Sequence, residues 1–173
     1  MMCDGFDAED TLAITAAQLA EYGWIVTGVG DPGDDGDDGS HRGSGEPPDT
    51  GPSWAYTVGL QDCFGHPELV VVGPGIPAGA RLLHQVVRRI EAGMPLAPGR
   101  SPLLEDGIVR VGIVHPVQYS LPTFNMWHAL HRHGHVLADH LAVLQVFAPR
   151  SWFCSCHQQV QHDLSDPGTV LAA

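Results

Sequence analysis

The segment that most constrains the fold of this chain runs from residue 54 to residue 72. It reads Trp-Ala-Tyr-Thr-Val-Gly-Leu over 54–60, and after a short connection an apolar run follows over 68–72. Aromatic and β-branched runs bounded by Gly and Pro are typical of strands, and a short connection makes neighbouring strands antiparallel. We therefore expect two paired strands joined by a tight turn, with Tyr56, His66 and Glu68 near the connection.

The remaining elements follow from hydrophobic periodicity. Apolar residues recur at helical spacing over 10–22 and 78–92, and a shorter helix is predicted over 123–133. Further strands are predicted over 24–29, 108–114 and 141–147. Because helices and strands do not alternate strictly, the pattern predicts an α+β fold: a mostly antiparallel sheet of about five strands with two or three packed helices.

Two segments lie outside this pattern. Residues 31–52 are rich in Gly, Asp and Pro, and the stretch 31–50 holds seven acidic residues against Arg42 alone. This composition predicts a disordered acidic insertion in a single domain of residues 1–150. A calcium loop is disfavoured, because both flanks are predicted strands and the closing Glu is missing. Residues 151–173 are polar and irregular, which predicts a divergent, flexible tail.

Charge and hydropathy narrow the class of partner. The net charge is -12 and the chain has no Lys, so it offers no basic face for nucleic acid. No apolar run reaches the roughly 20 residues of a membrane span. The N-terminus is acidic and lacks a signal-peptide core. We expect a cytoplasmic protein whose partner is another protein or a small molecule.

The first candidate site is the group formed by Tyr56, His66 and Glu68. A histidine titrates near neutrality and a carboxylate can fix its tautomer, so the group could bind a ligand or perform acid–base chemistry. With Thr57 and Tyr119 these residues are the ligand-binding candidates. The alternative is structural: His66 would satisfy backbone groups at a turn, and Tyr56 would pack in a half-buried strand.

The second candidate site is rich in His and Cys. His128 and His131 are three residues apart on the predicted helix, so they share a face. Imidazole and thiolate groups are ligands for zinc and other transition metals. The metal-ligand candidates are His128, His131, His135, Cys154, Cys156 and His157. The alternative is a solvated, His-rich helix face followed by a frayed tail, since one residue between the cysteines is tighter than the usual zinc spacing.

Several sites of known chemistry are not predicted. The run Gly-Val-Gly at 28–30 lacks the third Gly and the following helix of a dinucleotide fingerprint. No Gly-x-Ser-x-Gly elbow and no Walker-type loop occur in the chain. Nucleotide-dependent catalysis and serine hydrolysis are therefore disfavoured.

The chain resembles the bacterial family catalogued as domain of unknown function 4262. The resemblance rests on Tyr-Thr-Val-Gly-Leu at 56–60 followed by His-Pro-Glu-Leu at 66–69, in this order. It extends over residues 19–150, with the acidic insertion added. After the last strand the chain departs from the family pattern, with Phe-Ala-Pro-Arg at 147–150. The resemblance implies no activity.

Three functions remain open from the sequence. The first is a binding or accessory module, favoured because no catalytic constellation is complete. The second is a metal-binding protein or metal-dependent enzyme that uses the C-terminal His and Cys residues. The third is a small acid–base enzyme that uses Tyr56, His66 and Glu68.

Overall fold

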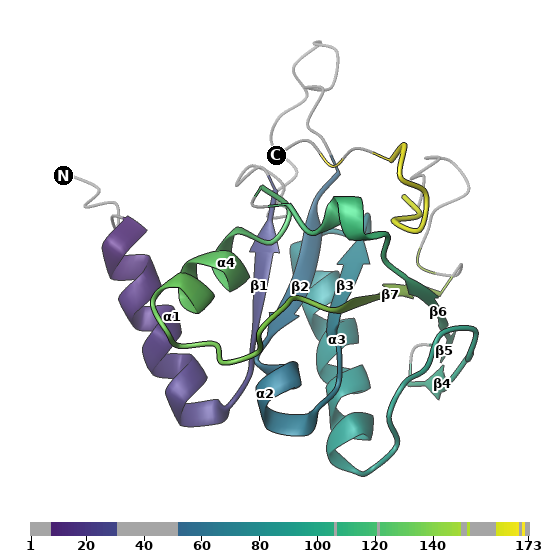
Figure 1. Cartoon of the computed structure of the whole chain (residues 1–173). Helices are drawn as coiled ribbons and strands as arrows, with labels where there is room; N and C mark the ends of the chain where they lie inside the picture. The colour runs from purple at the N-terminus through teal and green to yellow at the C-terminus, as the bar shows by residue number, and fades with distance from the viewer. Residues whose placement is uncertain are drawn as a thin grey trace, which may run out of the picture.

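The computed structural model describes residues 8–30, 52–105, 107–120, 122–149, 152, 162–169 and 171. Most of the predicted acidic insertion, and Cys154, Cys156 and His157, lie outside these residues. Figure 1 shows the arrangement of the elements. Their bounds are α1 Ala8–Tyr22, β1 Ile25–Val29, β2 Trp54–Val58, α2 Leu60–Phe64, β3 Glu68–Val72, α3 Ile76–Glu91, β4 Leu103–Leu104, β5 Gly107–Ile108, β6 Arg110–Ile113, η2 Pro116–Gln118, α4 Asn125–Arg132 and β7 Val143–Phe147.

A five-stranded sheet with the order β1-β2-β3-β7-β6 forms the centre of the molecule. β1, β2 and β3 are antiparallel neighbours, as are β7 and β6, whereas β3 and β7 run parallel. A separate pair, β4 and β5, forms a small antiparallel ribbon. The predicted α+β fold with a mostly antiparallel sheet is confirmed.

One face of the sheet is covered by α3. The apolar side chains of this helix recur every three or four residues and are fully or nearly buried: Leu82, Leu83, Val86, Val87 and Ile90. They pack on a cluster that includes Ala55, Leu69 and Val71 of the sheet. Burial of this apolar area is the main stabilising contribution on this side.

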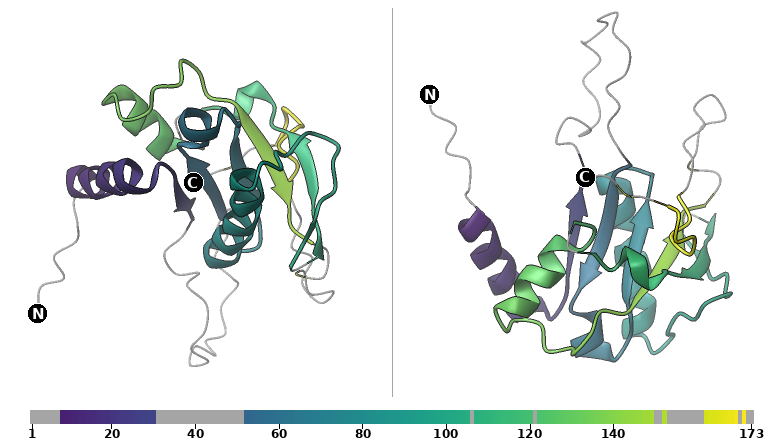
Figure 2. Two further views of the ribbon diagram at one scale, coloured as in Figure 1. Left: turned by 90° about the horizontal axis from the view of Figure 1, so that it is seen from below. Right: turned by 45° about the horizontal axis from the view of Figure 1, so that its top comes forward.

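The opposite face is covered by several segments. Figure 2 shows α4 on the side of the sheet away from α3. Side chains of α1 and α4 join Trp54, Tyr56 and Val70 of the sheet in a second cluster. The indole N–H of Trp54 donates to the Thr123 carbonyl over 2.9 Å, which ties the chain before α4 to β2. This face therefore combines apolar packing with hydrogen bonds between distant segments.

Part of the predicted tail packs against this face. Leu164 is fully buried, and its amide donates to the side-chain oxygen of Gln145 over 2.8 Å. The Gln145 side-chain nitrogen donates to the His162 carbonyl over 2.6 Å. The Gln118 side-chain nitrogen donates to the Thr169 carbonyl over 2.5 Å. The side chains of two buried glutamines thus hold residues 162–169 against the sheet through hydrogen bonds to the backbone of that segment. The polar composition of residues 151–173 had not indicated this packing.

The connection between β2 and β3 differs from the predicted tight turn, because it contains the helix α2. Gly59 before this helix and Gly65 after it both adopt the left-handed conformation, with φ of 107° and 61°. These glycines reverse the chain at both ends of a five-residue helix, since glycine enters this region at little cost. In the described part of the chain, no helix is long and apolar enough to cross a membrane.

Candidate functional site

Glu68 is the centre of the connection between β2 and β3. Its side chain is completely buried, and one carboxyl oxygen accepts hydrogen bonds from the amides of Gly59 (2.9 Å) and Gln61 (3.3 Å). The other oxygen accepts from the Thr57 hydroxyl over 2.7 Å. The first amides of a helix have no partner within the helix, and an acidic group is favourable there. Glu68 therefore caps α2 from the following strand.

Thr57 links this cap to the sheet. Its hydroxyl donates to Glu68 and accepts from the Leu69 amide over 2.8 Å. Burial raises the pKa of the Glu68 carboxyl, and the hydrogen bonds from Thr57 and from the backbone amides at the start of α2 oppose that rise. The Thr57 hydroxyl and both oxygens of the Glu68 carboxyl therefore all make hydrogen bonds within the protein.

The surroundings and the backbone conformation of Gly59 require a glycine at this position. A Cβ atom at this position would lie 2.4 Å from the Gly23 carbonyl oxygen and 2.7 Å from a methyl carbon of Leu19. The positive φ of Gly59 also disfavours any other residue. The Gly of the 56–60 pattern thus serves both the start of α2 and the close contact with the end of α1.

His66 satisfies backbone groups on two sides. The Leu96 amide donates to its Nε2 over 3.1 Å, and its Nδ1 lies 2.7 Å from the Pro67 carbonyl oxygen. Because Nε2 accepts, the proton of the neutral ring lies on Nδ1, which donates to Pro67. The residue is 4% exposed. Both ring nitrogens are engaged, so the geometry agrees with the structural interpretation of His66.

Tyr56 lies beneath α4. Its hydroxyl donates to the Asn125 side-chain oxygen and accepts from the Met126 amide, each over 2.9 Å. Its ring packs edge-on against Phe124, with 5.1 Å between the ring centroids. Burial holds the pKa of the Tyr56 phenol well above its ordinary value. Tyr56 therefore fixes the start of α4 and presents no free acid or base.

Tyr119, the fifth ligand-binding candidate, bridges two strands. Its hydroxyl donates to the Val114 carbonyl and accepts from the Val143 amide, each over 3.3 Å. It thus joins the end of β6 to the start of β7. The structure brings Thr57, Glu68 and His66 into one joint around α2, and it places Tyr56 and Tyr119 at other contacts.

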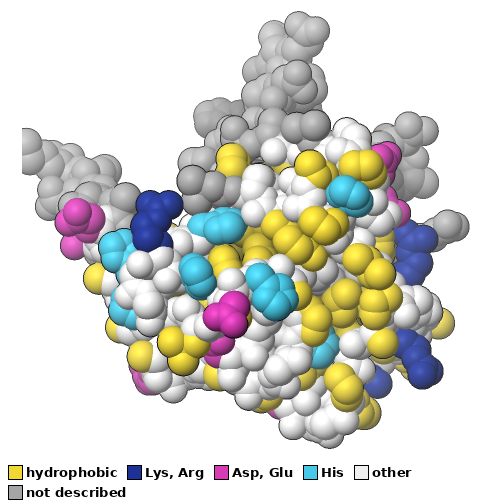
Figure 3. Space-filling model, viewed as in Figure 1, with side chains coloured by type: hydrophobic (Ala, Val, Ile, Leu, Met, Phe, Trp, Pro, Cys, Tyr) yellow, Lys and Arg dark blue, Asp and Glu magenta, His cyan; other side chains and the backbone are white. Residues whose placement is uncertain are grey.

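An open groove lies beside this joint. It has a volume of about 370 Å³ and runs between α2 and the segment before β7. Its lining residues are Gln61, Asp62, Gly65, His66, Pro67, Leu137, Ala138, Asp139, His140 and Ala142. Figure 3 shows this face of the molecule, with histidine side chains gathered over α4 and the segment before β7. Of the residues that carry the family resemblance, His66 and Pro67 line this groove.

Two side chains of α2 fix the far wall of the groove. Gln61 donates to the His140 carbonyl over 3.0 Å and accepts from the Ala142 amide over 3.0 Å. Asp62 accepts from the Leu137 amide over 2.8 Å. These bonds leave the side chains of Asp139 and His140 exposed at the rim. Three hydrogen bonds therefore hold α2 against residues 137–142, and the groove presents carboxylate, imidazole and apolar groups to solvent.

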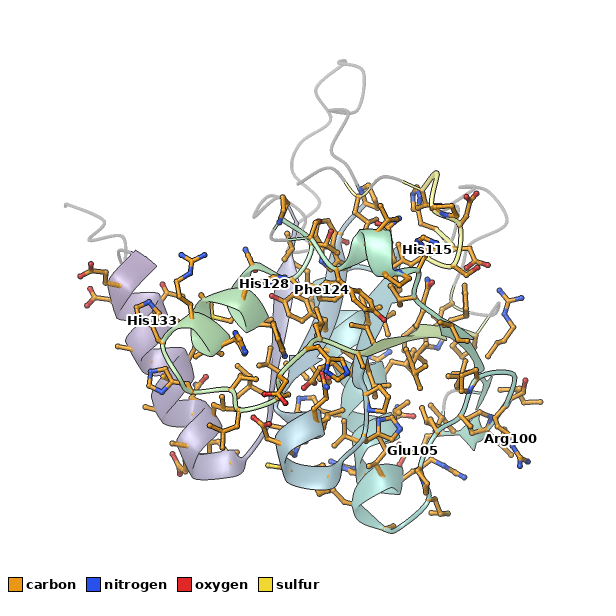
Figure 4. All side chains as sticks on the ribbon, in the orientation of Figure 1. Arg100, Glu105, His115, Phe124, His128 and His133 are labelled. Carbon is orange, nitrogen blue, oxygen red and sulfur yellow. The ribbon has the colours of Figure 1, made fainter. Side chains whose placement is uncertain are left out.

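The histidine candidates for metal binding lie on or just after α4. Nε2 of His128 lies 2.9 Å from the Tyr119 carbonyl oxygen, and the ring of His131 stacks on Trp127 at 4.9 Å between centroids. Figure 4 shows His128 on α4 and His133 just after its last residue, well apart from each other. Within the described residues, no group of three or more His, Cys, Asp and Glu is placed to hold a metal. A site that also uses Cys154, Cys156 and His157 remains a prediction.

Sequence reasoning did not predict the rim residues Gln61, Asp62 and Asp139. The first two lie on α2, a helix found where the sequence had predicted a tight turn. The available signal was a five-residue interval between Gly59 and Gly65 followed by an acidic residue, a spacing that suits a short helix with an external cap. No local signal placed residues 137–142 opposite α2.

The fold and the groove define an α+β domain with a polar, open surface beside a buried polar joint. A profile of the family described as Domain of unknown function (DUF4262) matches residues 18–151, so the chain belongs to this family. A search of curated proteins found no match, and a search of solved structures found none either.

Proposed function

We propose that the protein is a binding or accessory module whose ligand occupies the groove between α2 and residues 137–142. One observation carries the proposal. The polar atoms of Thr57, His66 and Glu68 are satisfied inside the protein, and His66 lines a groove beside them whose rim carries exposed acidic and imidazole side chains. Buried groups that fix the geometry beneath exposed polar groups are typical of a preformed binding surface.

The chemistry of the rim favours a ligand with a positively charged group. Asp62 and Asp139 supply carboxylates, and the part of the chain that the structure describes contributes no Lys or Arg to the lining. The net charge of -12 attracts cations to the surface as a whole. Leu137, 78% exposed, and Pro67 offer apolar contact to a short aliphatic stem. An amine or guanidine on such a stem fits these groups.

The acid–base alternative receives less support from the geometry. A general base needs a free atom within hydrogen-bond reach of its substrate. Both nitrogens of His66 bond to backbone groups, and the Glu68 carboxyl faces the start of α2. Either residue would have to break existing bonds before it could act.

The experiment is a titration of ¹⁵N-labelled protein followed by two-dimensional NMR. The probes are n-butylammonium and methylguanidinium, with butyrate and butanol as matched anionic and neutral probes. We expect the cations alone to shift the amides of residues 61–66 and 137–142. Asp139→Asn weakens this binding by about tenfold, whereas Glu9→Gln, the same change on an exposed residue of α1, does not. Equal shifts by butyrate, or shifts confined to other residues, contradict the proposal.

A further inference from the structure

A second groove, with none of the lining residues of the first, lies along the edge of the sheet. The sheet order makes β1 an edge strand, and in the described residues it pairs on one side only, with β2. The groove has a volume of about 570 Å³. Its lining comes from α1, β1 and α3: Gln18, Tyr22, Trp24, Ile25, Val26, His84 and Glu91. The edge of β1 thus lies between two helices.

The side chains of this groove combine aromatic surface with one carboxylate. The Trp24 indole N–H donates to the Glu91 carboxylate over 3.1 Å. The Trp24 ring packs against His84 with 5.1 Å between centroids, and Tyr22 is 65% exposed at the margin. Among the described residues, no Lys or Arg lines the groove. Aromatic faces beside a carboxylate attract an ammonium or guanidinium group.

We propose that β1 binds an extended peptide segment of a partner protein, and that a Lys or Arg of this segment enters the groove beside Glu91. An edge strand offers unpaired backbone N–H and C=O groups, and an added strand satisfies them. Side chains of an added strand alternate in direction, so every second one can point toward α3. This surface is separate from the groove at α2, and the proposal does not depend on that groove.

Charge favours a partner over a second copy of this chain. The strand β1 reads Ile-Val-Thr-Gly-Val and has no basic residue to place beside Glu91. Pairing of two β1 strands would also bring together two chains that each carry a net charge of -12. A basic, extended segment has a charge complementary to that of Glu91. Its backbone would pair with the open edge of β1, and one of its basic side chains would occupy the groove.

The test uses a displayed library of random ten-residue peptides, selected against the whole protein. We expect the selected peptides to be enriched in Lys or Arg between β-branched residues. A synthetic peptide from the selection then binds the Glu91→Gln variant about tenfold more weakly. The Gln side chain retains an acceptor for the Trp24 indole, so this variant changes charge without removing the contact. Glu9→Gln, the matched control, binds as the unmodified protein does.

A second measurement locates the peptide. Hydrogen exchange of the complex should slow at the amides of β1, and backbone N-methylation of alternate peptide residues should abolish binding. Selected peptides with no excess of basic residues overturn the proposal, as does equal affinity for Glu91→Gln. Protection at α2 instead of β1 also overturns it. A concentration-dependent dimer protected at β1, without peptide, replaces the partner with a second copy and equally contradicts it.

Discussion

The two faces of the central sheet are covered in different ways. One face is covered by the helix α3, whose buried side chains are all apolar, together with Leu96, Leu104 and Val109 from the chain that follows it. The other is closed by α1, α4, connecting segments and residues 162–169, which are joined to the sheet by side-chain hydrogen bonds across long sequence separations. The groove at α2 opens on the second side. Regular apolar packing provides the base of this fold, and distant polar contacts shape the surface proposed to bind.

The largest effect is expected on the face that α3 covers. Leu83 is fully buried, so Leu83→Ala leaves a cavity and should lower the free energy of unfolding by about 2–5 kcal/mol. Leu103→Ala at a residue that is 66% exposed is the control, with a change within about 0.5 kcal/mol. Urea unfolding followed by circular dichroism measures both. Equal losses in the two variants would show that α3 does not close a packed core.

Tyr56 tests the polar contacts of the other face. Tyr56→Phe leaves the Met126 amide and the Asn125 oxygen without the hydroxyl, and should cost about 1–3 kcal/mol. Tyr22→Phe, at an exposed position, is the control.

The same residue predicts a dependence on pH. Because burial raises the pKa of the Tyr56 phenol, the unfolded chain ionises above about pH 10 while the folded chain stays protonated. Stability is therefore fully present below pH 10, and Tyr56 lowers it by about 1.4 kcal/mol for each pH unit above that. Unfolding curves between pH 9 and 11.5 measure this slope. Tyr56→Phe should reduce it, and an unchanged slope would contradict the buried, protonated state of Tyr56.

Gln145 tests the attachment of the C-terminal segment. Gln145→Ala removes both bonds to residues 162–164 and should cost about 1–3 kcal/mol. The Leu164 amide should then exchange with solvent much faster. Gln18→Ala on the exposed face of α1 should leave its exchange unchanged. Slow exchange at Leu164 in both variants would mean that apolar packing alone holds this segment.

Hydrophobic periodicity in the sequence predicted the longer helices and most strands of this fold. The helix α3 and the strands β1, β2, β3 and β7 lie within a few residues of their predicted ranges, because each carries a strong periodic or β-branched run. The helix α2 was missed, because five residues rarely show a period and its cap, Glu68, comes from the next strand. The glycine spacing is compatible with this helix, but it does not identify Glu68 as the group that accepts from the first amides of the helix.

In the candidate site, too, local sequence predicted some residues and long-range contacts determined the rest. The pattern located His66 and Glu68 and offered a structural alternative for His66, with which the observed bonds agree. It did not place Asp62 and Asp139 on facing walls of one groove. That juxtaposition depends on the contacts of Gln61 and Asp62 with residues 137–142, which are far away along the chain. Long-range contacts of this kind leave no local trace.

The smallest effect is expected from metal removal. Within the described residues His128 faces a backbone carbonyl and His131 stacks on Trp127, so the helix α4 offers no converging set of ligands. Untagged, desalted protein should melt at the same temperature with and without a chelator. Mass spectrometry should find less than one metal ion per chain. Stoichiometric zinc and a lowered melting temperature would instead support a site with Cys154, Cys156 and His157.

The most direct test of the central claim compares His66→Ala with His140→Ala. His66 belongs to the internal structure of the groove and His140 to its exposed rim. Urea unfolding and the NMR titration with methylguanidinium are measured for both variants. We predict that His66→Ala loses about 1–3 kcal/mol of stability, while its folded fraction still binds the cation. We predict that His140→Ala keeps its stability and binds more weakly. Unchanged stability with lost binding in His66→Ala would contradict the account.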